Sequence, residues 1–179
     1  VMGVGESTRT AAEVGAIDCH AHVMPSEYVD KLVDASRKDP SLAPAARRLT
    51  EEHPHRFPLA LGNIDRRLEL MDAAGIETQV LAMGSPFLSS RDDRIRRSLV
   101  QTWNDSALDL AAEHPGRFFV FASVPLPDVR GAVAEVERLS GRENVIGWLI
   151  NTHPAGWPID DVRLDPLYAA WDATEAIVF

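Results

Sequence analysis

The sequence has almost no cysteine and no long apolar run. Cys19 is the only cysteine among 179 residues, so no disulfide can form within the chain, which predicts a reducing, cytoplasmic location. No segment approaches the roughly 18 consecutive apolar residues of a membrane-spanning helix, so an integral membrane protein is not expected. Residues 1–15 also lack the continuous apolar segment of a secretory signal, and we interpret them as a flexible leader.

Basic residues are in the minority. The chain has 18 lysines and arginines against 27 aspartates and glutamates, a formal net charge of -9. This balance argues against nucleic acid or an anionic membrane surface as a partner. A small-molecule substrate is compatible with it, even an anionic one, because a bound metal ion reverses the local field.

Short apolar segments alternate with longer amphipathic ones, which is typical of strand–helix units around a parallel sheet. Strands are expected from Ala16 to the neighbourhood of the histidines at 20 and 22, and over 78–83, 118–124, 145–151 and 176–179. Helices are expected between them over 26–39, 63–75, 92–114, 128–141 and 166–174. Ser26, Asn63 and Asp128 are the predicted N-caps of three of these helices.

The spacing of the last strands predicts a barrel. Val145 follows Phe118 by 27 residues and Ala176 follows Val145 by 31, close to the average unit of an eight-unit barrel of about 250 residues. We therefore predict an α/β fold of the (β/α)8 TIM-barrel type, incomplete, with about five of the eight strands in residues 16–179.

Two features interrupt this regular pattern. The proline-rich segment 40–62 is longer than a usual connection, and we interpret it as an inserted excursion. The last expected strand leaves an unpaired sheet edge. We therefore expect either further chain beyond Phe179 or a second chain that completes the sheet, and a homo-oligomer is one form of the latter.

The segment 17–25 carries the clearest chemistry. His20 and His22 stand two residues apart on a strand, so both side chains project from one face. At the carboxyl end of a barrel strand they face the active-site pocket, where two neutral imidazoles can share a divalent cation, zinc in the first place and manganese as the alternative. Asp18 is expected on the same face, one step deeper, to orient a histidine or to act as a weaker ligand. Cys19 is expected to point away. The alternative is two histidines that merely alternate in an exposed loop.

The segment 17–22 resembles the first-strand signature of the amidohydrolase superfamily. It is nearest to the amidohydrolase-related branch that includes aminocarboxymuconate-semialdehyde decarboxylase. Segments 67–76, 114–118, 145–147 and 164–168 are similar to further parts of the same branch. The resemblance covers nearly the whole chain after the leader. It implies that the chain is the N-terminal part of a metal-dependent barrel enzyme.

The resemblance also implies roles for individual residues. His20 and His22 match the two strand-one metal ligands of the family. The family's further ligands, on its fifth, sixth and eighth strands, fall beyond Phe179, where we also expect the catalytic acid–base residues. The implied activity is that of a hydrolase or a non-oxidative decarboxylase acting on a small carboxylated or cyclic substrate, with the branch favouring the carboxy-lyase.

Three further residues are candidates for substrate binding. Asn151 and His153 follow the fourth expected strand, where His153 can donate to a substrate carboxylate or only stabilise its own turn. Phe87 follows the second strand and lines the pocket or packs. Two other classes of function compete with the enzyme. One is a truncated, non-catalytic fragment that acts as a binding or assembly module through its open edge. The other is a nucleotide-binding sheet, which the lack of a glycine-rich phosphate loop opposes.

Overall fold

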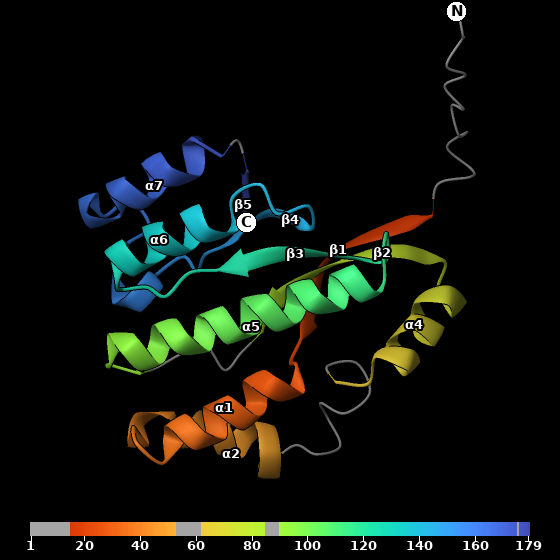
Figure 1. The fold of residues 1–179 in the computed structure, drawn as a ribbon, viewed down its shortest axis with the longest axis horizontal. Coiled ribbons are helices and arrows are strands. Elements are labelled where there is room, and N and C mark those ends of the chain that lie inside the picture. The colour runs from red at the N-terminus through yellow and green to blue at the C-terminus, as the bar shows by residue number, and fades with distance from the viewer. Residues whose placement is uncertain (1–14, 53–61, 85–89, 175) are drawn as a thin grey trace, which may run out of the picture.

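The computed structural model describes residues 15–52, 62–84, 90–174 and 176–179. Within these ranges, five parallel strands form one sheet in the order β1-β2-β3-β4-β5 (Figure 1). The strands are β1 (Ala16–Val23), β2 (Ile76–Met83), β3 (Phe118–Ser123), β4 (Val145–Leu149) and β5 (Ile177–Val178). Strictly sequential parallel strands with helical crossovers are the winding of a (β/α)-barrel wall.

The connections between the strands are helical. The α-helices are α1 (Ser26–Ser36), α2 (Ala43–Arg47), α4 (Ile64–Ala73), α5 (Asp93–Glu113), α6 (Val129–Leu139) and α7 (Asp165–Asp172). Shorter helical turns lie at Pro40–Leu42, Arg48–Glu52, Pro154–Gly156 and Val162–Leu164. All five strands expected from the sequence are present, and β1 runs through both histidines to Val23.

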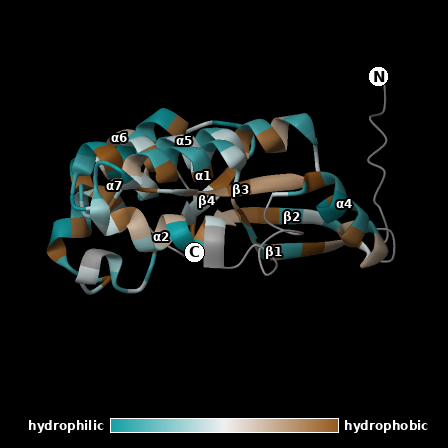
Figure 2. Cartoon of the chain, turned by 90° about the horizontal axis from the view of Figure 1, so that it is seen from below, coloured by the Kyte–Doolittle hydropathy of each residue, from teal (hydrophilic) through white to brown (hydrophobic). Residues whose placement is uncertain are grey.

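One face of the sheet is covered by helices. Figure 1 shows α5 lying along the strands, with α1 and α2 to one side of it and α6 and α7 to the other, and Figure 2 shows α5 and α6 on one side of β1 and β2. Leu81, Val120 and Trp148 from three strands are buried in one cluster with Leu99 and Trp103 of α5. Burial of each such side chain stabilises the fold by about 1.5–3 kcal/mol, so the main core lies in this layer.

The opposite face of the sheet is concave. It carries a small separate cluster of Val80, Ala82 and Phe121. In a flat sheet, four strand spacings of about 4.8 Å would separate β1 from β5 by about 19 Å. The ring centroids of His20 on β1 and Phe179 beside β5 nevertheless lie 5.1 Å apart. The sheet therefore curls around this face, as the wall of a barrel does, and we call it the inner face.

Side-chain caps set two helix starts as expected. Asn63 and Asp128 each accept a hydrogen bond from the backbone N–H three residues further on, at 2.9 and 3.0 Å. The expectation for Ser26 is wrong, because α1 already begins at Ser26 and makes no side-chain cap hydrogen bond. Pro25, in an extended conformation with φ -58 and ψ 145, occupies the N-cap position instead. A proline that leads into a helix has thus moved its start by one residue.

Parts of two expected segments fall outside the described residues. Of the leader 1–15, only Gly15 is described, and of the excursion 40–62, residues 53–61 are not. The described part of the excursion holds three short helical pieces before Glu52. In the ranges that the structure describes, no helix is long and apolar enough to cross a membrane.

Candidate metal centre and adjoining cavity

Two imidazole rings converge at the carboxyl end of β1. The Nε2 atoms of His20 and His22 lie 3.2 Å apart, and the two rings are nearly perpendicular, with centroids 4.8 Å apart. The ring of His20 is exposed and also stands edge-on to Phe179, which stacks on Phe121 of the inner face with centroids 5.2 Å apart. The predicted convergence of the two histidines on one face is therefore what the structure shows.

An irregularity in β1 separates these rings from Asp18. The sheet register aligns Asp18 with Gln79 but Ala21 with Leu81, so β1 has one more residue than β2 over this stretch. Because strand side chains alternate, one extra residue reverses the face on which the preceding side chains stand. Asp18 therefore shares the helix-covered face with Gln79, and the expectation that it lies on the face of the histidines is wrong.

The Asp18 carboxylate instead contacts the backbone of the irregularity. One oxygen accepts the backbone N–H of His20 at 3.1 Å, and the other accepts the side-chain amide of Gln79 at 2.9 Å. Such a bond from an aspartate to the N–H two residues on gives the backbone a local partner at the point where the pairing register shifts. Asp18 thus supports the strand from which His20 projects, and among the described residues its carboxylate bonds to the backbone of His20 and to Gln79 but to neither imidazole ring.

The opposite ring nitrogen of His22 has a partner that fixes its tautomer. Its Nδ1 lies 3.2 Å from the carbonyl oxygen of Ala82. A carbonyl oxygen only accepts, so Nδ1 carries the hydrogen and the Nε2 lone pair faces His20. Gly84 leaves room for this ring, because a Cβ there would lie 3.1 Å from Cγ of His22. The strand end is thus arranged to present Nε2 of His22.

The geometry of the pair fits one shared cation. Two nitrogens bound tetrahedrally at 2.0–2.1 Å to one zinc ion lie about 3.3 Å apart, and the observed Nε2 separation is 3.2 Å. The same separation also permits a hydrogen bond from one ring to the other. Over the described ranges, no group of three or more histidine, cysteine, aspartate or glutamate side chains is placed to hold an ion. Cys19 is exposed and unpaired.

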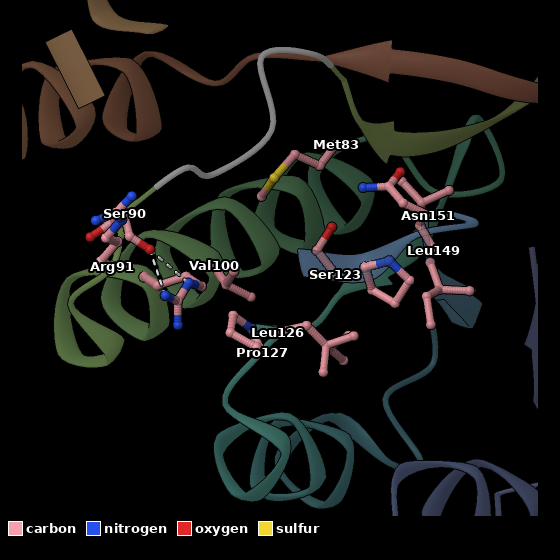
Figure 3. A pocket seen from close by; sticks show the side chains of 13 residues that line it. Met83, Ser90, Arg91, Val100, Ser123, Leu126, Pro127, Leu149 and Asn151 are labelled. Carbon is pink, nitrogen blue, oxygen red and sulfur yellow. Dashed lines mark hydrogen bonds between the residues drawn. The ribbon is translucent and has the colours of Figure 1, made fainter. Parts of the chain in front are cut away.

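A cavity of about 350 Å³ lies at the same end of the sheet (Figure 3). The ends of β2, β3 and β4 contribute Met83, Ser123 and Leu149 to its wall, and the start of α5 contributes Arg96. The guanidinium of Arg96 is buried and donates twice to the Ser90 carbonyl, at 3.1 and 2.5 Å. The cavity therefore combines apolar walls with a few polar groups, as small-molecule pockets do.

The candidate substrate-binding residues have different positions. Asn151 is exposed and lines the cavity, to which neither His20 nor His22 contributes. His153 is exposed, is not among the lining residues, and has its Nδ1 3.3 Å from the hydroxyl of Thr152. Phe87 lies outside the described residues. No observation assigns any of the three to a ligand, and their binding roles stay predictions.

With this geometry in view, comparison with known proteins identifies the family. The amidohydrolase family profile matches residues 17–179, which is most of the chain. The chain therefore belongs to the amidohydrolase family, as the first-strand segment predicted. This match also makes the two converging histidines part of the segment that the family shares.

Curated relatives point to one kind of amidohydrolase. The chain is 36% identical over 88 residues to a gamma-resorcylate decarboxylase of Rhizobium sp., a match over 49% of this chain and 27% of the relative. It is 34% identical over 105 residues to a gamma-resorcylate decarboxylase of Polaromonas sp., over 58% of this chain and 31% of the relative. The matched stretch thus spans about a third or less of the relatives' length.

Solved structures confirm the fold class. A 5-carboxyvanillate decarboxylase from Sphingomonas paucimobilis superposes with a TM-score of 0.76 at 23% identity, over 90% of this chain and 50% of that one. A dihydroxybenzoic acid decarboxylase from Polaromonas sp., crystallised with manganese and the inhibitor 2-nitroresorcinol, gives a TM-score of 0.66 at 24% identity, over 92% and 48%. The chain thus has the α/β fold of these barrel enzymes and spans about half of each.

Three contacts around the histidines were not anticipated from the sequence. Arg67 stands on the apolar stripe of α4, Gln79 directly precedes the buried half of β2, and Phe179 lies against His20. A charged residue on a buried stripe and an amide in a buried strand were the available signals, because each must find a polar partner. The contact with Phe179 depends on the curl of the sheet, which no local pattern encodes.

Proposed function

We propose that this chain supplies the first two metal ligands and part of the substrate pocket of a metal-dependent carboxy-lyase. The observation that carries the proposal is the convergence of the two Nε2 atoms at 3.2 Å at the carboxyl end of β1. In barrels of this kind, active sites lie at the carboxyl ends of the strands. The remaining ligands and the acid–base residues are assigned to the fifth to eighth strands of the family barrel.

The chain's own residues have distinct tasks in this proposal. His20 and His22 hold the ion through Nε2, and the Ala82 carbonyl keeps the hydrogen of His22 on Nδ1. A bound divalent cation supplies Lewis-acid chemistry, which stabilises negative charge that develops on a substrate. Phe121 and Phe179 form an apolar wall beside His20.

The proposed substrate is a small aromatic acid. The names of the curated relatives at 34–36% identity, all gamma-resorcylate decarboxylases, favour a hydroxylated aromatic carboxylate and a decarboxylation over a hydrolysis. Asn151 and His153, which follow β4, are proposed to donate hydrogen bonds to it, and Phe87 is proposed to contact its ring. The same relatives do not favour the alternative of a non-catalytic binding or assembly module.

The identity of the ion is a finer proposal. Imidazole ligands suit zinc, whereas carboxylates and water suit manganese. The two histidines are only part of the proposed ligand set, so they do not by themselves select one of the two ions. Three solved neighbours hold manganese. We propose manganese or zinc. The single cysteine agrees with a cytoplasmic enzyme. The apolar side chains of Ile17 on β1 and Ile177 on β5 are exposed, which agrees with a homo-oligomer that covers these sheet edges.

Metal analysis and a product assay test the proposal together. The protein, expressed at its full natural length without a histidine tag, is expected to hold about one manganese or zinc ion per chain and to release carbon dioxide from 2,6-dihydroxybenzoate. Replacing both His20 and His22 by alanine is expected to remove the ion and the activity. Because His20 is exposed, its loss costs little packing, and the single variant His20→Ala is expected to change the unfolding free energy by less than about 1 kcal/mol.

A matched control separates loss of ligands from loss of any histidine. His114 stands at the far end of the sheet, at the end of α5, with its ring edge-on to Phe118. His114→Ala is expected to keep both metal and activity. Metal content that is unchanged in the His20→Ala, His22→Ala variant contradicts the proposed ligands, and hydrolysis without release of carbon dioxide contradicts the proposed reaction.

A further inference from the structure

One buried guanidinium reaches the backbone that carries both histidines. Arg67 lies on α4 with only 4% of its surface exposed, on the helix-covered side of the sheet. Its Nη2 donates to the carbonyl oxygen of His22 at 2.5 Å, and its Nη1 donates to the side-chain oxygen of Gln79 at 2.9 Å. The planar fork of an arginine can make these two bonds at once, which a single ammonium cannot reproduce.

The bond to Gln79 extends the contact to the second histidine. Because the Gln79 oxygen accepts from Arg67, its amide N–H group is turned towards Asp18, which accepts it at 2.9 Å. The other oxygen of Asp18 accepts the backbone N–H of His20 at 3.1 Å. Arg67 therefore contacts His22 directly and His20 through two side chains, while both imidazole rings project from the opposite face.

Burial of the Arg67 guanidinium is unfavourable unless its hydrogen bonds compensate for the loss of hydration. Burial lowers the pKa of Arg67, and the charge of Asp18 acts in the opposite direction. Its Nε has no hydrogen-bond partner among the residues that the structure describes, so the guanidinium is only partly satisfied. A hydrophobic residue at this point of the α4 stripe would pack without that cost. The gain must come from the two bonds that it makes to β1 and Gln79.

We propose that Arg67 is the positioning residue of the metal centre, holding the irregular end of β1 so that Nε2 of His20 and Nε2 of His22 converge on one ion. Gln79 and Asp18 transmit its effect to His20. This inference rests on the proposed function for the ion, but the restraint on the strand exists without it. Removal of a group that hydrogen-bonds to a metal ligand and orients it typically lowers metal affinity 10–100-fold.

Two substitutions divide the network. Arg67→Lys keeps a positive charge but cannot bond both the His22 carbonyl and the Gln79 amide. Gln79→Glu keeps the acceptor for Arg67 and the contact to His22, but offers no N–H to Asp18 and places a second carboxylate beside it. The first variant releases both histidines, whereas the second releases His20 alone.

A matched control exists at the other end of the sheet. Arg117, next to the start of β3, donates through Nε to the backbone carbonyl of Glu77 at 2.8 Å and through Nη2 to Asp72 at 2.7 Å. It makes the same pair of contacts, one to a strand carbonyl and one to a side chain, far from the carboxyl end of β1. Arg117→Lys therefore reports the general effect of losing an arginine fork on a strand.

The experiment measures two quantities on the full-length protein and these variants. Manganese affinity is measured by electron paramagnetic resonance titration, and amide hydrogen exchange of residues 17–24 is measured by mass spectrometry in metal-free protein. Arg67→Lys is expected to weaken manganese binding 10–100-fold and to accelerate exchange at 17–24, with Gln79→Glu intermediate in both. Arg117→Lys is expected to change manganese affinity by less than about threefold and to leave exchange at 17–24 unchanged.

The outcomes distinguish this inference from the function on which it rests. Wild-type affinity and wild-type exchange at 17–24 in Arg67→Lys overturn the positioning role. Equal loss of affinity in Arg67→Lys and Arg117→Lys overturns it as well, because the effect is then one of general stability. If Arg67→Lys does not fold, the test is the comparison of Gln79→Glu with Arg117→Lys: wild-type manganese affinity and wild-type exchange at 17–24 in Gln79→Glu then overturn the positioning role. If wild-type protein binds no manganese or zinc, the proposed function fails, and hydrogen exchange alone still decides whether Arg67 holds the strand.

Discussion

The ends of β1 and β3 are both held by polar side chains from a neighbouring helix, but only the end of β1 carries proposed metal ligands. At the end of β3, Asn104 of α5 accepts the backbone N–H of Ser123 at 2.9 Å and donates to its carbonyl at 3.0 Å. The same amide donates to Glu135 of α6 at 2.8 Å, and Glu135 accepts two bonds from Arg138 at 2.7 and 2.8 Å. Asn104 and Glu135 are at most 1% exposed.

The network at β1 is built from the same kinds of group, but it supports a strand whose two imidazoles we propose as ligands of an ion. Arg67, Gln79 and Asp18 hold the strand from the helix side, and the Nε2 atoms of the histidines stand on the inner face. Around Ser123, by contrast, the side chains of Asn104, Glu135 and Arg138 are hydrogen-bonded to one another. The network at β3 thus braces a strand against two helices, whereas the network at β1 lies behind the two histidines that we propose as ligands.

Removing the brace of β3 is expected to have the largest effect on stability. Asn104→Ala removes the partner of both the buried N–H and the carbonyl of Ser123, and leaves Oε1 of Glu135 with the bond from Arg138 alone. It is expected to lower the free energy of unfolding by about 3 kcal/mol. Manganese affinity of the folded protein is expected to stay within about threefold of wild type, because the two networks share no residue. Urea unfolding measures the free energy of unfolding. A fall in manganese affinity well beyond threefold would contradict the distinction between the two strand ends.

The charge of Glu135 gives the brace a pH dependence. Burial opposes that charge, but hydrogen bonds from Arg138 and Asn104 outweigh burial and hold the pKa of Glu135 below its ordinary 4.5. A lowered folded pKa means that the stabilisation is complete above pH 4.5 and is lost as pH falls through the folded value. Glu135→Gln is expected to cost about 2 kcal/mol at neutral pH and less below pH 4.5. A difference between the two proteins that stays constant down to acid pH would contradict this account.

Trp103 connects the two regions, and the loss of its single hydrogen bond is the smallest of the expected effects. It is fully buried on α5, one residue before Asn104, and its indole N–H donates to the carbonyl of Val23 at the end of β1 at 3.0 Å. Trp103→Phe keeps an aromatic ring but removes this donor, and is expected to lower unfolding free energy by about 1 kcal/mol beyond the loss of ring area. Hydrogen exchange should rise at residues 17–24 and not around Ser123, and the reverse pattern would show that Trp103 belongs to the β3 brace.

The strands, the helices and the family were predictable because each has a local signal. Apolar strand 78–83, the caps at Asn63 and Asp128 and the His-x-His spacing all depend on residues close in sequence. The face of Asp18 was not predictable, because strict alternation holds only in a regular strand and the extra residue in β1 is defined by its pairing with β2. The expected start of α1 was wrong by one residue for a similar reason, since Pro25 takes the position assigned to Ser26.

The parts of the site that bring distant elements together were also hidden from the sequence. Arg67 and His22 are 45 residues apart, and Gln79 and Asp18 are 61 residues apart. Their contact needs the packing of α4 on the sheet, and the contact of His20 with Phe179 needs the curl of all five strands. A buried arginine on the stripe of α4 signals that a partner exists but does not identify it.

The central claim is that His20 and His22 hold one ion between their Nε2 atoms. Crystals of the full-length protein grown with manganese, with diffraction recorded above and below the manganese absorption edge, test it most directly. The account predicts an anomalous peak within bonding distance of both Nε2 atoms, on the inner face beside Phe179. Two imidazoles bonded to each other with no ion between them, or a manganese ion held by other residues, would contradict it.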